Sequence, residues 1–341
     1  MYKKLFFNVL IIMSAMNSMA MDNKLAKTML RQSVGENIIY NKFVLKSVVK
    51  SGTNNLYVLD MFDIKEFDMK SGAVVKEFAK SDGHIYNDFV VGNHDLSNEI
   101  LIIGSFGKIK LWNLNHDRGV AELKHNTLNS ESASVAKVIV GHDTNVLCSQ
   151  SAKTINIWDI NTRQCTGSNT ISHSTPNKYY EGPSILRKKL LYVVCNENVH
   201  DDTSNIGRFD IRSGKFESLC ASKKIKSIVL DGLQDSLSVF SGLTYGGVEE
   251  WDIRQLKKPV KVMKDDRSFI RDIYLESNRL YVGLTDKNSS AVKIQVLNKE
   301  QDAFFVVDSL PVANNIILSL NGDNKKLFVA GALGLSVFSI S

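Results

Sequence analysis

The histidines are the first side chains to consider for chemistry, because imidazole serves both as a metal ligand and as an acid–base catalyst. The chain has seven histidines in 341 residues, and none is spaced as His-x-His or His-Glu-x-x-His. The one dense polar group is His200 with Asp201 and Asp202, which could contact a cation or a partner. A polar surface loop accounts for this trio more simply. The sequence therefore assigns no metal, no cofactor and no catalytic residue.

Other catalytic motifs do not stand out either. The chain shows no Gly-rich phosphate-binding loop, no serine-nucleophile elbow and no Cys–His pair. Histidines that are distant in the sequence could still meet in the folded chain. What such residues can do depends on the elements that position them.

A repeated strand pattern defines those elements. In the hexapeptide 155–160, Ile155 and Ile157 share one face of a strand and Trp158 lies on the other, so the strand is packed on both sides. The pattern recurs at intervals of about 45 residues, the period of propeller blades. All three tryptophans of the chain occupy its bulky position, called the slot below. The slot residues are Phe67, Trp112, Trp158, Phe209, Trp251, Val296 and Phe338.

Each slot residue is preceded by two apolar runs and followed by a third. For the second repeat these runs are 88–91 and 101–105, and 73–78 follows the slot of the first repeat. Turn-forming residues separate the runs, which predicts four short strands per repeat and an all-β chain.

The pattern resembles the WD-repeat family of β-propellers. The resemblance rests on Trp158-Asp159, Trp251-Asp252, Trp112-Asn113, Phe67-Asp68 and Phe209-Asp210, and it covers nearly all of the chain after its N-terminal segment. It implies one seven-bladed propeller of four-stranded antiparallel blades over residues 21–341. It also implies a protein-interaction platform, an inference from fold alone.

The resemblance further implies a hydrogen-bonded set of side chains in the second blade. The family places a Gly-His pair before the first strand, and Gly83-His84 occupies that position. With Ser105 and Trp112, His84 supplies three of the four members. The fourth, a turn Asp, is missing, since Phe106 and Gly107 stand in its place.

The last repeat ends directly after its slot strand, so its blade needs an outer strand from elsewhere. Counting back from Phe67 by the offset of the second blade places an extra strand near residues 28–32. We expect this N-terminal strand to complete the seventh blade beside 335–340 and close the ring. Deleting residues 21–35 is then expected to lower the melting temperature sharply.

Residues 1–20 have the features of a secretory signal peptide. Lys3 and Lys4 precede the apolar run 5–13, and Ser18-Met19-Ala20 is a small-residue cleavage site. The run is shorter than the ~20 residues of a membrane-spanning helix. We therefore expect export, to a bacterial periplasm or beyond, without a membrane span.

Charge does not indicate a nucleic-acid partner. The net charge of +6 includes Lys3 and Lys4, and the remaining basic residues are scattered, whereas nucleic-acid binding needs them clustered on one face.

The four cysteines fall in predicted second strands (Cys148, Cys195) and fourth strands (Cys165, Cys220). Strands two apart are too distant for a disulfide, which favours buried free thiols.

The contact region predicted from sequence is the rim that carries the longest loops. These are 126–134, 166–178 and 196–205, with Tyr179 and Tyr180 as aromatic anchors. The alternative is that both tyrosines cap the core. Arg267 and Arg271 could reach the axial opening; the alternative for them is pairing with Asp265, Asp266 or Asp272.

Two functions remain open. The first is a monomeric, exported, non-catalytic platform that binds a protein. The second is an enzyme or small-ligand binder that uses the axial funnel, as propeller-type quinone-dependent dehydrogenases and lactonases do. Three or more ionisable side chains that converge on the axis favour the second.

Overall fold

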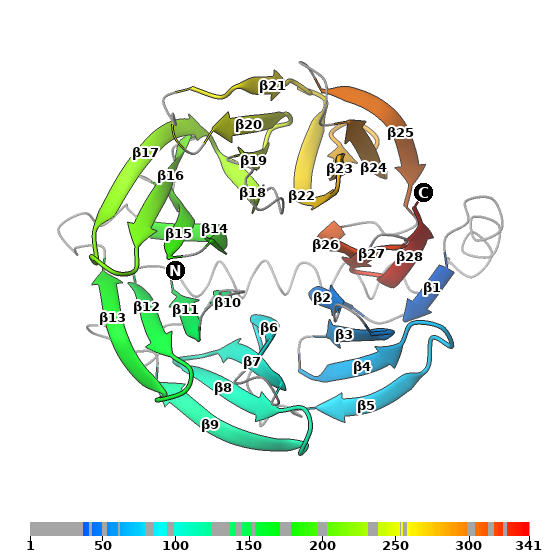
Figure 1. Cartoon of the computed structure of the whole chain (residues 1–341). Coiled ribbons are helices and arrows are strands. Elements are labelled where there is room, and N and C mark those ends of the chain that lie inside the picture. The colour runs from blue at the N-terminus through cyan, green and yellow to red at the C-terminus, as the bar shows by residue number, and fades with distance from the viewer. Residues whose placement is uncertain are drawn as a thin grey trace.

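A computed structural model gives the structure of the chain. It describes residues 37–340 except 41–42, 50–52, 61, 79–84, 94–98, 125–134, 136, 141–144, 152–153, 171–178, 188, 197–202, 231–237, 253, 255–257, 299–303, 313–316 and 323–325. The described chain forms seven separate four-stranded antiparallel sheets. Figure 1 shows these sheets arranged as blades around a central axis. The prediction of an all-β, seven-bladed propeller is confirmed.

Blades one to six each consist of four consecutive strands, with the first strand innermost (Figure 1). The first three blades are β2 (Lys46–Val49), β3 (Asn55–Leu59), β4 (Ile64–Asp68) and β5 (Val74–Phe78); β6 (Asp88–Asn93), β7 (Glu99–Ser105), β8 (Lys108–Asn113) and β9 (Arg118–Lys124); and β10 (Lys137–Val140), β11 (Val146–Gln150), β12 (Thr154–Asp159) and β13 (Gln164–Thr170).

The next three are β14 (Tyr179–Arg187), β15 (Leu190–Asn196), β16 (Thr203–Asp210) and β17 (Phe216–Lys223); β18 (Ile225–Leu230), β19 (Ser238–Leu243), β20 (Val248–Asp252) and β21 (Lys261–Met263); and β22 (Ser268–Glu276), β23 (Arg279–Asp286), β24 (Val292–Asn298) and β25 (Phe305–Pro311). Blade seven combines β26 (Ile317–Gly322), β27 (Lys326–Gly331) and β28 (Gly334–Ser339) with β1 (Asn37–Tyr40).

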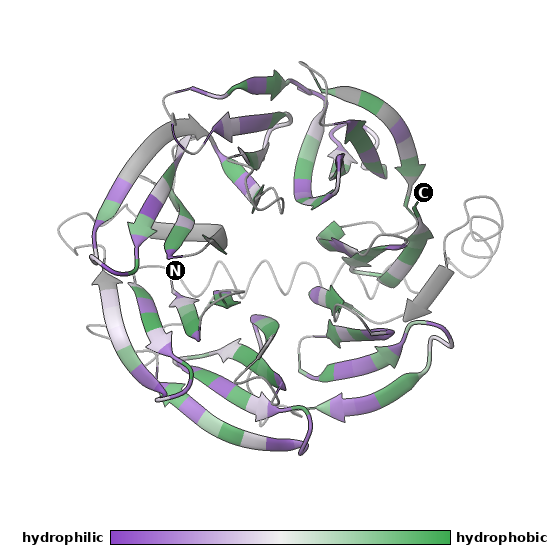
Figure 2. Ribbon diagram, in the orientation of Figure 1, coloured by the Kyte–Doolittle hydropathy of each residue, from purple (hydrophilic) through white to green (hydrophobic). Residues whose placement is uncertain are grey.

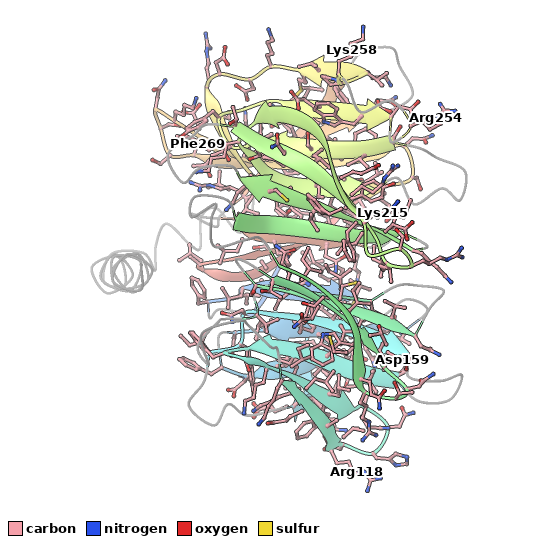
Figure 3. All side chains as sticks on the ribbon, turned by 90° about the vertical axis from the view of Figure 1, so that its left-hand side faces the viewer. Arg118, Asp159, Lys215, Arg254, Lys258 and Phe269 are labelled. Atoms are coloured by element: carbon pink, nitrogen blue, oxygen red, sulfur yellow. The ribbon has the colours of Figure 1, made fainter. Side chains whose placement is uncertain are left out.

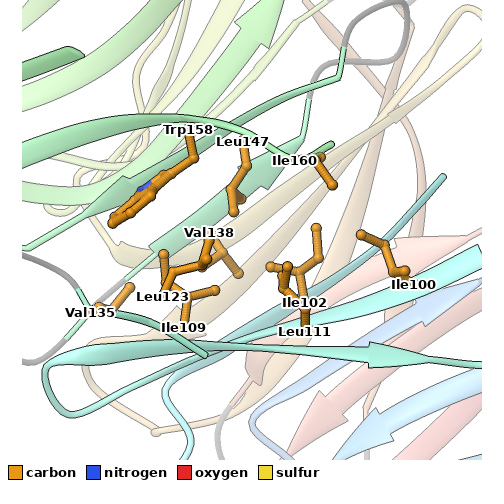
Figure 4. Packing of buried hydrophobic residues seen from close by; sticks show 10 residues of the cluster. All are labelled: Ile100, Ile102, Ile109, Leu111, Leu123, Val135, Val138, Leu147, Trp158 and Ile160. Atoms are coloured by element: carbon orange, nitrogen blue, oxygen red, sulfur yellow. The ribbon is translucent and has the colours of Figure 1, made fainter. Parts of the chain in front are cut away.

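The core lies between the blades, and the slot residues help to form it. Trp158, in β12 of blade three, packs in a cluster with Ile100, Ile109 and Leu123 of blade two (Figure 4). Trp251, in β20 of blade five, packs likewise on Val194 of blade four. Figure 2 shows the hydrophobic residues spread over the strands of every blade, as this packing requires. Burial of one apolar residue per blade against its neighbour wedges the sheets into a ring.

In blade six the assignment of the slot to Val296 is wrong by one residue. In the other blades the slot residue pairs with the second strand as Leu147 pairs with Trp158, and in blade six the equivalent partner, Leu280, pairs with Leu297. Leu297 packs on blade five, whereas Val296 packs on blade seven. Because side chains alternate along a strand, a slip of one residue selects the opposite face.

The N-terminal strand closes blade seven as predicted, but it lies further along the chain. β1 pairs antiparallel with β28, with Asn37 opposite Val337. Residues 28–32, where the strand was expected, lie outside the described residues. The prediction assumed that the N-terminal strand precedes blade one by the same spacing as β5 precedes blade two. The spacing is shorter, because the connection 41–45 between β1 and β2 has fewer residues than the connection 79–87 between β5 and β6.

This position changes the truncation experiment. A chain that begins at residue 36 keeps β1, so its melting temperature is expected to match that of the chain beginning at residue 21. A chain that begins at residue 41 loses the strand that closes the ring. Each lost ladder hydrogen bond contributes about 1 kcal/mol, so its melting temperature should fall by several degrees. Equal melting temperatures for all three chains would contradict closure by β1.

The described cysteines lie in the predicted strands as free thiols, Cys148 buried, Cys195 partly buried and Cys165 exposed. Exposure of Cys165 corrects the expectation that the thiols are buried. Burial raises the pKa of Cys148 to about 12. In the native protein at pH 8, iodoacetamide is therefore expected to modify Cys165 and to leave Cys148 intact, as peptide mass spectrometry would show. Urea should expose Cys148, and fast native labelling of Cys148 would contradict its position.

Candidate functional site: the axial ring and an aromatic–cationic face

Six polar residues of the innermost strands occupy equivalent positions around the axis. We call Lys46, Asp88, Lys137, Ser227, Asp272 and Ser319 the axial ring. Their partners in the second strands are Leu59, Gly104, Gln150, Gly242, Gly283 and Ala330, each at the same place relative to the slot. In blade four the register shifts between Tyr180 and Ser184, so that blade has no clear counterpart.

Asp88 joins three consecutive blades. Its Oδ1 accepts a hydrogen bond from Lys46 Nζ of blade one at 2.6 Å, and its Oδ2 accepts one from the backbone N–H of Val138 in blade three at 3.0 Å. Lys46 Nζ also donates to the carbonyl oxygen of Phe89 at 2.8 Å. The carboxylate is buried and both its oxygens are bonded, so Asp88 fastens the ring from within.

Asp272 does the same on another side of the ring. Its Oδ1 accepts hydrogen bonds from Ser227 Oγ of blade five at 2.5 Å and from the N–H of Ile273 at 2.9 Å. Its Oδ2 accepts one from the N–H of Leu320 in blade seven at 2.8 Å. Two aspartates thus fasten blades one to three and blades five to seven.

The charges of the ring interact across the axis. Burial would raise the pKa of Asp88, but the ammonium groups of Lys137 and Lys46 hold it below its ordinary value. Burial raises the pKa of Asp272, whose hydrogen-bond donors are neutral and only partly compensate. Burial lowers the pKa of Lys46 despite its pairing with Asp88. Among the described residues, two basic and two acidic side chains therefore converge on the axis.

A second group of side chains lies on one face of blades five and six. The rings of Tyr245 and Phe269 pack with centroids 6.2 Å apart. Lys287 Nζ lies 5.2 Å from the Phe269 centroid and 5.9 Å from that of Tyr245. The guanidinium of Arg271 lies 5.8 Å from the same Phe269 ring. We call these four residues the aromatic–cationic cluster.

The cluster comes from two turns and the start of one strand. Tyr245 lies in the β19–β20 turn, Lys287 in the β23–β24 turn, and Phe269 and Arg271 at the start of β22. In Figure 3, Phe269 lies on one face of the ring. Asp159, at the end of β12, lies on the opposite face with Lys215 and Arg254, which are in third-to-fourth-strand turns. The backbone N–H of Lys287 donates to the carbonyl oxygen of Arg267 at 2.8 Å, which ties two of the connections together.

Two solved structures resemble the chain over most of its length. The structure described as the RRP9 WD40 repeats has a TM-score of 0.71 at 11% sequence identity, and the match covers 90% of this chain and 98% of that chain. A chain of the mitotic checkpoint complex has a TM-score of 0.66 at 14% identity, with 88% and 93% covered. The fold is that of a WD-repeat propeller. No protein-family model and no curated protein matches the sequence, so the likeness is one of fold.

The hydrogen bond between tryptophan and serine that is implied by the WD-repeat resemblance forms in other blades than expected. Trp112 Nε1 donates to Asp117 Oδ1 at 3.3 Å, and Ser105 Oγ donates to the carbonyl oxygen of Lys108 at 3.5 Å. His84 lies outside the described residues. In blade three Trp158 Nε1 donates to Ser149 Oγ at 2.8 Å. In blade five Trp251 Nε1 donates to Ser241 Oγ at 3.0 Å. These two indoles are buried, whereas Trp112 is partly exposed and turns toward the acidic turn.

Of the residues predicted to contact a partner, Arg271 joins the cluster and Arg267 lies beside it, exposed in the turn before β22. Tyr179 and Tyr180 begin the innermost strand of blade four, opposite Asn196 and Cys195. His200 lies outside the described residues. Part of the expected loop 166–178 is strand, because β13 extends to Thr170.

The described part of the propeller also bears on metal and membrane binding. No three His, Cys, Asp or Glu side chains group there as a metal site would require. The same residues include no helix long and apolar enough to cross a membrane.

A pocket of about 200 Å³ lies between blades six and seven, lined by Arg279, Tyr281, Val296, Asp308, Leu310, Ser339 and Ile340. It adjoins the end of β28, away from the cluster.

Proposed function

We propose that the protein is an exported, monomeric, non-catalytic platform that binds another protein and binds no nucleic acid. The observation that carries this proposal is the bonding of the axial ring. Asp88 and Asp272, the carboxylates best placed to act as acid or base in the funnel, already accept hydrogen bonds on both oxygens from other blades. They hold the scaffold together, and a rigid scaffold suits recognition on its faces.

The competing proposal of a funnel enzyme draws on the same ring. Four ionisable groups converge on the axis, which by number alone meets the criterion for a ligand site. Their hydrogen bonds favour the scaffold instead, because both oxygens of each aspartate join neighbouring blades. The exposed candidate surface is the face of the aromatic–cationic cluster.

Binding can be tested with purified, immobilised protein and material from the compartment to which it is exported. A captured protein is expected to rebind the purified propeller saturably, with one-to-one stoichiometry by calorimetry. The Tyr179→Ala/Tyr180→Ala double variant tests the rim of blade four. Turnover of a small molecule in the funnel, abolished by Asp272→Asn in a folded variant, would overturn the proposal of a non-catalytic platform.

Export has a separate test. A chain expressed with residues 1–20 is expected to be recovered outside the cytoplasm with an N-terminus at Met21, as mass spectrometry of the intact protein would show. A matched chain with Lys3→Glu and Lys4→Glu should be exported less efficiently, because the positive start of a signal peptide is lost. Recovery of an uncleaved cytoplasmic protein would contradict export.

A further inference from the structure

We propose that the aromatic–cationic cluster binds an acidic peptide segment of the partner, with Arg271 and Lys287 pairing to its carboxylates. This inference rests on the proposed function, because it names the chemistry of the protein that the platform recognises. Three features of the cluster carry it: an arginine held without an acidic partner, a lysine suspended over two rings, and neighbouring acids that face the backbone.

Arg271 is the first feature. Its guanidinium is partly buried, and burial lowers its pKa, with no carboxylate opposing the effect. Arg271 Nε donates to Thr285 Oγ1 at 3.2 Å, a neutral acceptor. Within the described chain no carboxylate forms an ion pair with Arg271, so the expected pairing with Asp265, Asp266 or Asp272 is absent. A guanidinium has five N–H donors in a fork that matches a carboxylate, and an arriving anion would restore its lost solvation.

Lys287 is the second feature. Its Nζ donates to the carbonyl oxygen of Asp266 at 2.7 Å, which holds the ammonium over Tyr245 and Phe269. The side chain remains exposed, and Tyr245 is 42% exposed. Exposed aromatic rings beside fixed cations are the composition of binding hot spots. The apolar ring edges can contact the methylene groups of a glutamate whose carboxylate meets Lys287.

Two neighbouring acids bond to the backbone rather than to Arg271 or Lys287. Asp265 Oδ1 accepts the backbone N–H of Arg267 at 3.0 Å, and Asp286 Oδ1 accepts the N–H groups of Asn288 and Ser289. Arg267 is exposed in the same connection, and Lys226 occupies in β18 the register-shift position that Arg271 occupies in β22. The face therefore presents several cations beside two carboxylates, those of Asp265 and Asp286, that accept hydrogen bonds from the backbone of turns.

A peptide fits this surface better than a nucleic acid does. The two rings are tilted by 57° to each other, so they do not form a parallel platform on which successive bases could stack. The cations form one short patch, whereas a nucleic-acid strand needs a basic track along its backbone. A partly buried guanidinium is reached by a single projecting group, such as an aspartate or glutamate side chain.

Fluorescence anisotropy with a fluorescein-labelled deca-glutamate peptide tests the proposal, using the propeller beginning at residue 21 in low salt. Arg271→Gln and Lys287→Gln should each weaken binding by about threefold to tenfold, and the double variant by more. Lys215→Gln is the matched control, since it removes the same charge from an exposed side chain on the opposite face (Figure 3). It should leave binding within about twofold. A Gly-Ser peptide of equal length should not bind, and melting curves of the variants should match the parent.

Four outcomes would overturn the proposal. Equal losses in Lys215→Gln and Arg271→Gln would show that the probe senses only net charge. Tighter binding of a deca-uridylate RNA through the same two residues would assign the cluster to phosphate. Absence of saturable binding would remove the site. If a captured protein binds the Arg271→Gln/Lys287→Gln variant with unchanged affinity, the acidic-peptide proposal fails and the platform stands.

Discussion

Replacing Trp251 by alanine is expected to lower the free energy of unfolding by about 3–5 kcal/mol, the range for truncation of a large buried side chain. The indole is 1% exposed and packs between blade five and blade four. Alanine leaves a cavity that neighbouring strands cannot fill, because each is held in its own sheet by ladder hydrogen bonds. The variant also removes the hydrogen bond that Ser241 Oγ accepts from Trp251 Nε1, while Ser241 Oγ keeps its contact with Glu249 Oε2 at 3.5 Å.

Two companion variants separate packing from hydrogen bonding. Trp251→Phe keeps most of the apolar contact, and Ser241→Ala removes the acceptor of the indole N–H together with the long bond from Ser241 Oγ to Glu249, at about 1 kcal/mol for each bond. Trp112→Ala should destabilise less than Trp251→Ala, because Trp112 is partly exposed and bonds to an exposed turn carboxylate. Urea unfolding followed by circular dichroism compares all four. If Trp251→Ala and Ser241→Ala had equal effects, the slot would not be the wedge between blades.

The fold could be predicted because the blade repeats. A single strand pattern such as that of 155–160 is compatible with many folds. Seven copies of the pattern at regular spacing along the chain are compatible with few folds other than a propeller. The two wrong predictions, the slot residue of blade six and the position of the N-terminal strand, concern features that the repeat does not determine. Val296 and Leu297 are both apolar, so composition could not decide which faces blade five, and only the pairing of Leu280 does. The position of β1 depends on the length of a connection, which no periodicity encodes.

The sequence also contains a signal for the axial ring, an aspartate at the same place in two innermost strands, and the sequence analysis did not use it. Asp88 opens the apolar run Asp88–Val91, and Asp272 precedes another apolar pair, at equivalent places in two blades. A carboxylate in an innermost strand is costly to bury unless it is bonded, so its recurrence predicts a fastening role. The aromatic–cationic cluster had no such signal. Tyr245, Phe269 and Lys287 come from two turns and a strand end of blades five and six, which only the packing of these two blades brings together.

The two fasteners imply that the propeller is stiffest where the blades converge. β22 lies beside both β18 and β26, and the hydrogen bonds of Asp272 cross both gaps. Asp88 does the same between β2 and β10. The cluster residue Arg271 directly precedes Asp272 in the same strand. A fixed backbone there limits the freedom that Arg271 would lose on binding, which favours affinity by preorganisation.

Replacing Asp88 by alanine is expected to destabilise the protein by about 3 kcal/mol, the lower end of the range for one partner of a buried ion pair, since Lys46 is partly exposed. The variant leaves the Lys46 ammonium without its carboxylate and the Val138 N–H without an acceptor. Lys46→Met in the same background should recover part of the loss by removing the stranded charge. The Val138 N–H remains unbonded, so recovery should be incomplete.

The pH dependence of Asp88 gives an independent check. Its pKa in the folded protein lies below the ordinary value, so the unfolded chain binds the proton more tightly. The stabilisation is therefore fully present above the unfolded pKa of about 3.9 and is lost as the pH falls through the lower folded value. The stability difference between the parent and Asp88→Asn, measured by urea unfolding, should be constant from pH 7 to about 5 and shrink below about 4. A difference that grew on acidification would place the carboxylate elsewhere than between blades one and three.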